Sequence, residues 1–576
     1  MSELINEIYI PDSLLNCLYD CDECNHDHGS EFEKLVSQIL SSIETASINS
    51  IPNNLFKQKN KHIPGWNYYV REKRECAIEW HNLWKSNNSP SYGFLFDMRK
   101  TSRKDYHAAV KEVQRNRNMI IRNNIAQNLG SNKNAKFWKE VKNVNKSKSN
   151  CKIIPNEIDG VVGSDICNLF KRNYENLYSD SKMRNFDMLM RECNLKIMNS
   201  CNDRLNDKAN NHLHDVTYEH VKAAIGKLKN NKKDEHYLIC SDAFKNAPPV
   251  LFYALSFIYN CMIKFCITTD VFNVVTIVPI VKNNRKSKND SANYRAISLN
   301  SCLCKILDLI LISFFDDFLL SSENQFSYKK SLSTTTCSFI LIETLQYYIK
   351  RNSNVIATFL DCSKAFDKVN YDRLFDLLLK RGLCPRITKL MLTLYSSINA
   401  EVRWGGSYSN VFSIFNGVKQ GGVLSPLLFN LYLDVLIERL LSLNVGCHVG
   451  SRNVAVLAYA DDLVLLSPTK KGMDLLLKCC DDFSREYNLI FNPNKCNYIK
   501  YGKFTYDLNL MLNNEVINEV SESKHLGHLI TKRSTGIFDG TSIINELKQK
   551  TNVLLSSFYH LDVNSRVKIF NTQCSC

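Results

Sequence analysis

Two adjacent carboxylates stand in the stretch Tyr459-Ala460-Asp461-Asp462, between apolar runs at 454–458 and 463–466. Each flank is short and rich in aliphatic side chains, which predicts a hairpin of two buried strands with the acids at its turn. Two acids at such a turn would be costly to bury without a cation, and Mg²⁺ takes oxygen ligands. Asp-Asp also forms ordinary polar turns, so the tetrapeptide alone leaves a metal site and a plain turn open.

A third carboxylate, Asp361, directly follows the apolar run 355–360, which predicts a strand that ends at this acid. Asp361 and the Asp461-Asp462 turn are therefore candidates to meet at neighbouring strand ends. Such an arrangement can hold two divalent ions about 3.5–4 Å apart. One ion would lower the pKa of an attacking hydroxyl, and the other would stabilise a leaving phosphate.

A glycine-containing loop lies between these acids, at 416–426, and a strongly apolar segment follows it at 427–440. The apolar segment predicts a helix. Glycines beside a helix start let the backbone approach a ligand closely. The loop could equally be a plain connection whose Ser425 and Pro426 start the helix, and both interpretations can hold together.

Upstream, the short apolar run 277–280 leads through Val281-Lys282 into a basic, Asn- and Ser-rich loop and then into Asn293-Tyr294-Arg295. This order predicts two strands joined by a cationic loop. Such a hairpin is suited to gripping phosphates.

Length and composition exclude several classes of protein. The 576 residues are 44% hydrophobic, enough for several domains with sizeable cores, and the net charge of +15 favours a polyanionic partner such as nucleic acid. The N-terminus lacks the pattern of a signal peptide, and the most apolar region, 251–281, is too interrupted to span a bilayer. With 22 cysteines, we expect reduced thiols in the cytoplasm, the nucleus or both, and no membrane association.

Most of the excess positive charge lies between Met98 and Asn150, where fourteen Lys and Arg face three acids. Tyr106, Phe137 and Trp138 are interleaved with these cations, a pattern that suits a nucleic-acid backbone. A solvated helical linker explains the same residues about equally well. Helical spacing also appears at 32–43, at Trp80 and Trp84, from Ser164 to Leu177, and at 216–228.

Soft metal ligands crowd near the N-terminus, in an acidic run: Cys17, Cys21, Cys24, His26 and His28. Zinc could bind there. Structural zinc sites usually pair two ligand couples across an intervening loop, so a solvated Cys/His-rich loop is the favoured interpretation.

Together the motifs resemble reverse transcriptases of non-LTR (LINE-type, jockey-like) retrotransposons. The resemblance is carried by Asp361-Cys362-Ser363-Lys364-Ala365-Phe366-Asp367, by Gly417-Val418-Lys419-Gln420-Gly421 with Ser425-Pro426-Leu427-Leu428-Phe429-Asn430, and by Tyr459-Ala460-Asp461-Asp462. The segments 278–282, 293–299, 325–326, 492–495 and 525–527 resemble further motifs of the family, in the family's order.

The resemblance implies a role for each matching residue. Asp361 and Asp461 would bind both metal ions, and Asp462 would support the site. Phe366 would lie under the sugar and exclude a 2′-hydroxyl, although it could instead be a core aromatic.

The remaining matches concern the incoming nucleotide. Gln420 and Gly421 would contact the nucleotide and the template. Arg295 and Lys282 would hold the triphosphate, where fixed cations stabilise the charge that builds on phosphoryl oxygens. Lys495 could protonate departing pyrophosphate, or it could be a solvated loop residue.

The fold that the resemblance implies is α+β: a right-hand polymerase with an antiparallel palm sheet, helices, fingers and a partial thumb, after a mostly helical N-terminal region. We expect a basic helical linker region at 1–150, a helical extension at 151–250, fingers and palm at 251–520, and the end of the palm with a truncated thumb at 521–576. Family members usually encode an endonuclease ahead of the polymerase, which this sequence does not resemble. We therefore expect a fragment or a degraded copy.

The expected activity is RNA-directed DNA polymerase. Two Mg²⁺ ions, or Mn²⁺ as a substitute, would serve transfer from a dNTP to a primer 3′-hydroxyl, with an RNA template and a DNA primer or target DNA as partners. One rival is a catalytically inactive remnant that still binds nucleic acid. Another is an RNA-templated RNA polymerase, which the bulk of Phe366 disfavours.

The sequence also departs from the family pattern in three places. A Gly-Asp-Gly-like turn is replaced by the segment 232–236, Ala296 stands where proline is usual, and Ser327-Tyr328-Lys329-Lys330-Ser331 stands where glycines are expected. None of these changes touches the acids. They fall in the fingers region, where we expect them to affect the loops and the grip on the template.

Overall fold

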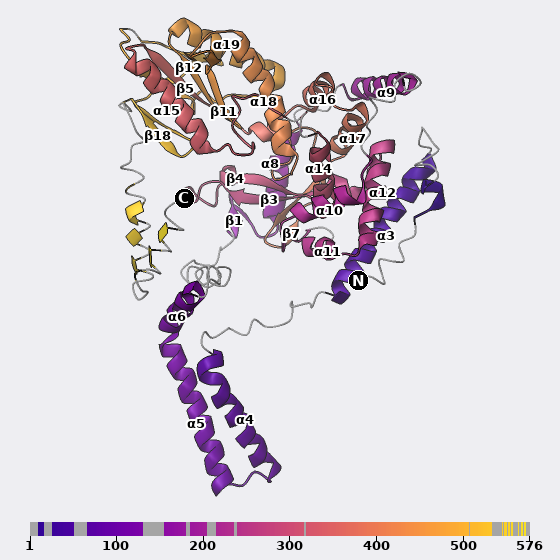
Figure 1. Ribbon diagram of the computed structural model, residues 1–576, viewed down its shortest axis with the longest axis vertical. Coiled ribbons are helices and arrows are strands. Elements are labelled where there is room, and N and C mark those ends of the chain that lie inside the picture. Colours follow the sequence, from indigo (N-terminus) through magenta and orange to yellow (C-terminus); the bar gives the residue numbers. More distant parts are fainter. Residues whose placement is uncertain are drawn as a thin grey trace. The chain divides into compact units, whose positions relative to one another are not determined.

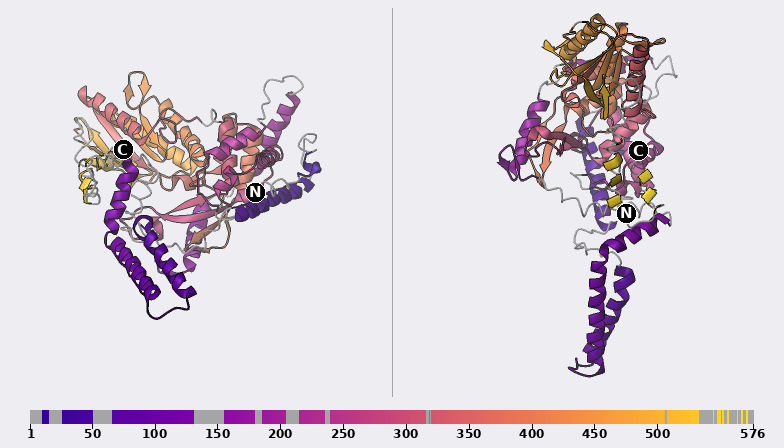
Figure 2. Two further views of the ribbon diagram at one scale, coloured as in Figure 1. Left: turned by 60° about the horizontal axis from the view of Figure 1, so that its bottom comes forward. Right: turned by 90° about the vertical axis from the view of Figure 1, so that its left-hand side faces the viewer.

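The computed structural model (Figures 1 and 2) describes residues 10–15, 26–50, 66–130, 155–179, 185–203, 215–234, 239–315, 318, 320–505, 507–532 and scattered positions from 544 to 571. The chain divides into two compact units. The first comprises Met1–Pro52 and Pro155–Phe538, and the second comprises Asn53–Ile154 and Asp539–Cys576.

The central sheet of the first unit has the strand order β11-β12-β5-β13-β16. Its strands are β5 (Val355–Asp361), β11 (Val456–Tyr459), β12 (Asp462–Ser467), β13 (Asn497–Tyr501) and β16 (Asn518–Glu519). All neighbours pair antiparallel except β13 and β16, which are parallel at the edge. The expected palm sheet is therefore present, with one parallel edge pair that the sequence pattern did not predict.

Both faces of β5, β11 and β12 are buried, which explains why these three strands are almost continuously apolar rather than alternating. Val355, Ala357 and Phe359 pack in a cluster with α15 (Thr334–Lys350). Ile356 and Leu360 belong to the larger core that also contains side chains of α18 (Ser425–Ser442) and α19 (Lys470–Tyr487). In Figure 1 these helices surround β5, β11 and β12.

A second sheet carries the predicted cationic hairpin. Its order is β4-β3-β6-β7, with β8 also paired to β6, and its strands are β3 (Val274–Val281), β4 (Tyr294–Leu299), β6 (Asn399–Trp404), β7 (Ser407–Tyr408) and β8 (Phe412–Ser413). β3 and β4 pair antiparallel around the loop at 282–293, as the sequence predicted.

The remaining helices of the first unit are α3 (His26–Ser50), α8 (Asp165–Tyr178), α9 (Phe186–Asp203), α10 (Tyr218–Lys227), α11 (Ser241–Lys245), α12 (Pro249–Phe265), α13 (Asp270–Asn273), α14 (Cys302–Phe315), α16 (Tyr371–Lys380) and α17 (Pro385–Ser396). The described residues of this unit also form the short 3-10 helices η2 (Ser291–Asn293) and η3 (Ala365–Lys368). They form four short hairpins as well: β1 (Glu157–Ile158) with β2 (Val161–Val162), β9 (His448–Val449) with β10 (Arg452–Asn453), β14 (Met511–Leu512) with β15 (Glu515–Val516), and β17 (Glu522–His525) with β18 (His528–Thr531). The helices predicted from apolar spacing at 32–43, 164–177, 216–228 and 427–440 are all present, as α3, α8, α10 and α18.

The second unit contains a helical hairpin, seen side by side in both views of Figure 2, made of α4 (Arg71–Ser86) and α5 (Phe94–Arg115), with α6 (Arg117–Gly130) after it. Val70, Val113 and Ile120 form its small core. The Trp80/Trp84 helix is α4, and α5 and α6 confirm helix for the first part of the basic segment.

Several predictions fall outside the described residues: the side chains of Cys17, Cys21, Cys24, His26 and His28, the basic segment beyond residue 130, and most of the expected thumb. The four-part division of the chain also stays a prediction. Among the helices that the structure describes, none has the length and apolar character needed to cross a membrane.

Candidate active site

Strands β5 and β12 bring two acids side by side. Asp361 is the last residue of β5, Asp462 is the first residue of β12, and the two are directly opposed in the antiparallel ladder. Opposed residues of such a pair carry their side chains on the same face, with Cβ atoms about 5 Å apart. Asp461 lies in the two-residue turn between β11 and β12, beside Ala460, whose φ is +55°.

The turn is held in place by a buried side chain from a distant part of the sequence. Gln325 Oε1 accepts a hydrogen bond of 3.0 Å from the backbone N–H of Ala460. The same oxygen accepts from the backbone N–H of Ser327 at 3.1 Å. The backbone N–H of Phe326 donates to the carbonyl of Ala458 at 2.8 Å, so the segment 324–326 runs along β11 and fixes the turn that carries Asp461.

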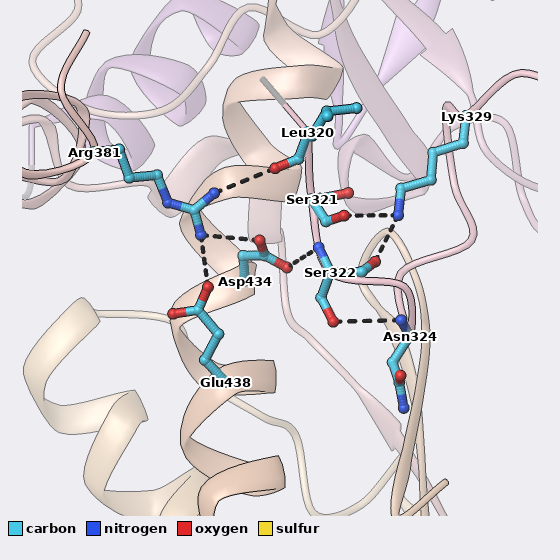
Figure 3. Close-up of polar contacts among 8 residues, drawn as sticks. All are labelled: Leu320, Ser321, Ser322, Asn324, Lys329, Arg381, Asp434 and Glu438. Carbon is cyan, nitrogen blue, oxygen red and sulfur yellow. Dashed lines mark hydrogen bonds and ion pairs between the residues drawn. The ribbon is translucent and has the colours of Figure 1, made fainter. Parts of the chain in front are cut away.

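That supporting segment is anchored by the polar cluster shown in Figure 3. Asp434 of α18 is buried, accepts a 2.9 Å hydrogen bond from Arg381, and accepts a 2.7 Å hydrogen bond from the backbone N–H of Ser322. Arg381 also pairs with Glu438 at 2.9 Å and donates to the carbonyl of Leu320 at 3.3 Å. The cluster therefore ties α18 and the end of α16 to the segment that supports the turn of Asp461.

The paired acids are electrostatically strained. Burial, and then the charge of Asp361, raises the pKa of Asp461. Burial, and then the charges of Asp461 and Asp361, raises the pKa of Asp462 to about 6. A bound cation would relieve this repulsion, and carboxylate oxygens are the ligands that Mg²⁺ takes.

The donor set therefore fits a divalent ion by its chemistry, but it is not closed. In the part of the chain that the structure describes, no three His, Cys, Asp or Glu side chains form a group that could hold a metal ion. Lys495 Nζ instead lies 3.0 Å from Asp361 Oδ2. A metal ion at Asp361 would compete with this ammonium, which is a relationship that the sequence did not predict.

A cavity of about 1020 Å³ opens beside the acids. All the predicted site residues except Asp462 line it: Lys282, Arg295, Asp361, Phe366, Gln420, Gly421, Asp461 and Lys495. Residues far apart in sequence thus share one cavity, while Asp462 is placed by its register opposite Asp361.

Phe366 lies between the cavity and the core, so its position is compatible with either of its two predicted roles. Its ring lines the cavity and stacks on the ring of Phe429, with centroids 4.3 Å apart and planes at 15°. The core aromatic behind it is Phe429, which is fully buried. Phe366 is therefore both packed from one side and presented to the cavity on the other.

The glycine of the predicted nucleotide loop is needed for close backbone packing. Gly421 has a φ of +109°, and a Cβ at this position would lie 2.9 Å from the carbonyl oxygen of Ser298 in β4. The backbone N–H of Ser298 also donates to the carbonyl of Gln420 at 2.7 Å. The loop is thereby fixed against the cationic hairpin.

Four cations line the same cavity as the acids: Lys282, Arg295, Lys364 and Lys495. Partial burial, and then the charges of Lys364 and Arg295, lowers the pKa of Lys282. Repulsion among cations in a cavity marks a place where an anion would be favoured. Sequence reasoning missed Lys364, which lies in the same loop as Asp361 and lines the same cavity.

Sequence reasoning also missed Gln325 as the support of the turn, and Tyr178 and Asp367, which hydrogen-bond to each other at 2.9 Å. Gln325 stands at the start of a family-like motif, which marked the residue in the sequence but did not indicate that it supports the turn. Tyr178 gave no signal, because its partner lies 189 positions away.

Residues 283–549 match the family model described as reverse transcriptase (RNA-dependent DNA polymerase). This reverse transcriptase-like domain makes up a little under half of the chain. The palm sheet, the fingers hairpin and the opposed acids all lie in this domain or directly before it. The α+β fold with palm and fingers is therefore confirmed.

Relatives of this reverse transcriptase domain come from non-LTR retrotransposons, as the motifs predicted. The chain is 30% identical over 204 residues to the Pol polyprotein of the type-2 retrotransposable element R2DM of Drosophila melanogaster, covering 35% of this chain and 19% of that protein. It is 24% identical over 372 residues to the RNA-directed DNA polymerase of the mobile element jockey of Drosophila funebris, covering 62% of this chain and 40% of that protein. The chain thus matches less than half the length of these relatives.

Proposed function

We propose that this chain is an RNA-directed DNA polymerase, which adds deoxynucleotides to the 3′-hydroxyl of a primer. The observation that carries the proposal is the shared cavity. It brings together carboxylates from β5 and the β11–β12 turn, Lys282 directly after β3, Arg295 of β4, and Phe366. Phosphoryl transfer needs this combination of metal ligands, phosphate-binding cations and a shaped sugar site.

The chain's own residues would act on the nucleotide in defined ways. Arg295, Lys282 and Lys364 would bind the triphosphate and stabilise charge on its oxygens. Phe366 would exclude a 2′-hydroxyl by bulk, and Gln420 would contact the nucleotide. Lys495 would first break its ion pair with Asp361, and its ammonium group would then donate a proton to the departing pyrophosphate.

Reverse transcriptase domains depend in general on a divalent metal. In this chain Asp361 and Asp461 would hold it, with Asp462 in support, and we propose two Mg²⁺ ions for which Mn²⁺ can substitute. When bound, these ions would lower the pKa of the primer hydroxyl and stabilise the leaving phosphate.

The basic helices of the second unit would contribute binding to nucleic acid. α5 and α6 carry Arg and Lys at Arg99, Lys100, Arg103, Lys104, Lys111, Arg115, Arg117 and Arg122. Neutralising phosphates by such side chains releases counterions, so affinity should fall steeply with salt. RNA template and DNA primer or target DNA are the proposed partners.

Primer extension tests the proposal. The chain should extend a DNA primer on an RNA template with dNTPs and Mg²⁺, and Asp461→Asn should bind the same template without extending it. If the unmodified chain binds the template but never extends the primer, it is a binding remnant of a polymerase. Incorporation of ribonucleotides at rates equal to those of deoxynucleotides would instead indicate an RNA polymerase.

A further inference from the structure

Asp367 is a buried acid that the proposed mechanism does not use. Its side chain is 5% exposed, lies in the loop that follows Asp361, and lines the cavity. Its Oδ1 atom accepts two hydrogen bonds of 2.9 Å, one from the Tyr178 hydroxyl and one from Gln420 Nε2. The acid therefore joins the end of α8 to a residue predicted to contact the nucleotide.

The contact with Asp367 decides which way the Gln420 amide points. An ionised carboxylate only accepts hydrogen bonds, so the amide must turn its NH₂ group toward Asp367. Burial raises the pKa of Asp367 to about 6, which leaves the carboxyl ionised at pH 7.5. Gln420 then keeps its carbonyl oxygen free to accept a hydrogen bond from the nucleotide.

The backbone around this pair is fixed on both sides. The carbonyl of Asp367 accepts a 2.7 Å hydrogen bond from Asn416 Nδ2, and a Cβ on Gly417 would lie 2.8 Å from that same carbonyl. The backbone N–H of Val418 donates to the carbonyl of Phe366 at 2.8 Å. Asp367 thus couples the loop of Phe366 to the loop of Gln420.

Helix α8 reaches this site from a part of the chain before the matched reverse transcriptase region. Its last residue, Tyr178, donates to Asp367, and its carbonyl accepts from the backbone N–H of Phe415 at 3.1 Å. Asn416 Nδ2 also donates to the carbonyl of Leu177 at 3.3 Å. The end of α8 is therefore hydrogen-bonded both to Asp367 and to the segment that leads into the Gln420 loop.

We propose that Asp367 and Tyr178 are positioning residues, which orient the Gln420 amide and thereby set the affinity of the site for the incoming deoxynucleotide. This inference rests on the proposed polymerase function and deepens it. It extends the nucleotide site to α8 through a chain of three side chains, of which Tyr178 and Asp367 are buried and Gln420 is half-buried. No contact between Asp367 and the nucleotide is required.

The test measures the Kd of a matched dNTP on a primer–template whose primer ends in a dideoxynucleotide, so that binding is measured without chemistry. Asp367→Leu and Gln420→Leu should each weaken binding about tenfold, the effect of losing an oriented hydrogen bond. The double variant should weaken it no further, because both changes remove one interaction. Asp367→Asn keeps an acceptor and should recover part of the affinity.

Tyr178→Phe should weaken dNTP binding about threefold, since Asp367 keeps one of its two donors. Its matched control is Tyr259→Phe, which removes a buried 3.1 Å hydrogen bond to the carbonyl of Leu303 away from the cavity. This control should lower stability without changing dNTP affinity.

The inference would be overturned if the Kd of the dNTP in the double variant rose by the product of the two single-variant fold-changes. An unchanged Kd in Asp367→Leu would also overturn it. The proposed function fails separately, if the unmodified chain binds the dNTP but does not add it to an ordinary primer. A chain that does not bind the dNTP at all overturns both.

Discussion

Individual residues of this site both contact neighbouring parts of the fold and line the cavity. Phe366 stacks on Phe429 and lines the cavity. Gly421 lets its backbone pack closely against β4. Lys495 forms an ion pair with Asp361, a carboxylate that is proposed to bind metal. A motif identifies such residues by type. It does not reveal that Phe366 has a packed side and an open side.

Phe366→Val should relax discrimination against ribonucleotides. Removing bulk under the sugar opens space for a 2′-hydroxyl, so kcat/KM for rNTP relative to dNTP should rise about tenfold to a hundredfold, the range that small steric changes give. Single-nucleotide incorporation on an RNA template measures the ratio. Phe429→Leu is the control, because it disturbs the same stack without lining the cavity. If both variants lose stability and neither changes the ratio, Phe366 is only a core aromatic.

At the scale of elements, the turn that carries Asp461 depends on segments that contribute none of the proposed catalytic residues. The segment 320–329 supports the turn through Gln325 and is itself held by Arg381 and Asp434. The sequence predicted the strands well, because continuous apolar runs and terminal acids are local signals. It could not predict this support, since Gln325 and Ala460 are 135 positions apart.

Asp434→Asn should destabilise the domain strongly. The buried carboxylate accepts hydrogen bonds from Arg381 and from the backbone N–H of Ser322, and its loss leaves Arg381 with the exposed partner Glu438. The free energy of unfolding should therefore fall by about 1.5–3 kcal/mol, the usual contribution of a hydrogen bond to a charged group. Urea denaturation measures this cost. Glu438→Gln serves as the control, because Glu438 is 63% exposed and such partners contribute at most about 1 kcal/mol. Equal losses in both variants would contradict the assignment of Asp434 as the anchor.

The loop after Gln325 keeps a glycine-like backbone without glycines. Tyr328 and Ser331 have φ values of +56° and +67°, in the segment where the family pattern has glycines. A side chain in this conformation costs about 1 kcal/mol or more. Ser331→Gly should therefore raise the free energy of unfolding by about 1 kcal/mol, while Ser331→Ala should not. Urea denaturation of the two variants compares them, and equal stabilities would show that Ser331 is unstrained.

Across the whole molecule, long-range contacts decide what sequence reasoning could and could not reach. The palm sheet, the hairpin of β3 and β4, and the meeting of Asp361 with the Asp461-Asp462 turn followed from motifs and apolar patterns. The parallel pairing of β13 with β16 did not, because a two-residue edge strand carries almost no pattern. The Tyr178–Asp367–Gln420 chain joins three distant segments, and no local signal points from one to another.

The domain as a whole should lose stability in acid partly through His525. Its side chain is 5% exposed and lies 5.6 Å from the Phe359 ring, and burial lowers its pKa to about 4. The unfolded chain takes up this proton near pH 6.5, so stability is fully present above that pH and is lost as pH falls toward 4. The loss attributable to His525 should be about 3 kcal/mol.

His525→Phe isolates this contribution. The pKa values of Asp308, Asp367 and Asp462 are each raised to about 6, so these acids increase the free energy of unfolding as the pH falls. This effect is the same in the unmodified chain and in His525→Phe. The difference in the free energy of unfolding between the two proteins should therefore change between pH 6.5 and pH 4. A difference that is constant over this range would show that His525 is protonated in the folded domain.

The proposed polymerase activity requires that the opposed acids of β5 and β12 act as one catalytic centre. Its most direct test is the single-turnover rate of dNTP addition to a DNA primer on an RNA template in Mg²⁺, for the unmodified chain and for Asp361→Asn. The unmodified chain should add the nucleotide, and the variant should be at least about a thousandfold slower at similar template affinity, because a metal ligand supplies several kcal/mol to the transition state. Equal rates, or no addition by the unmodified chain on a template that it binds, would contradict the account.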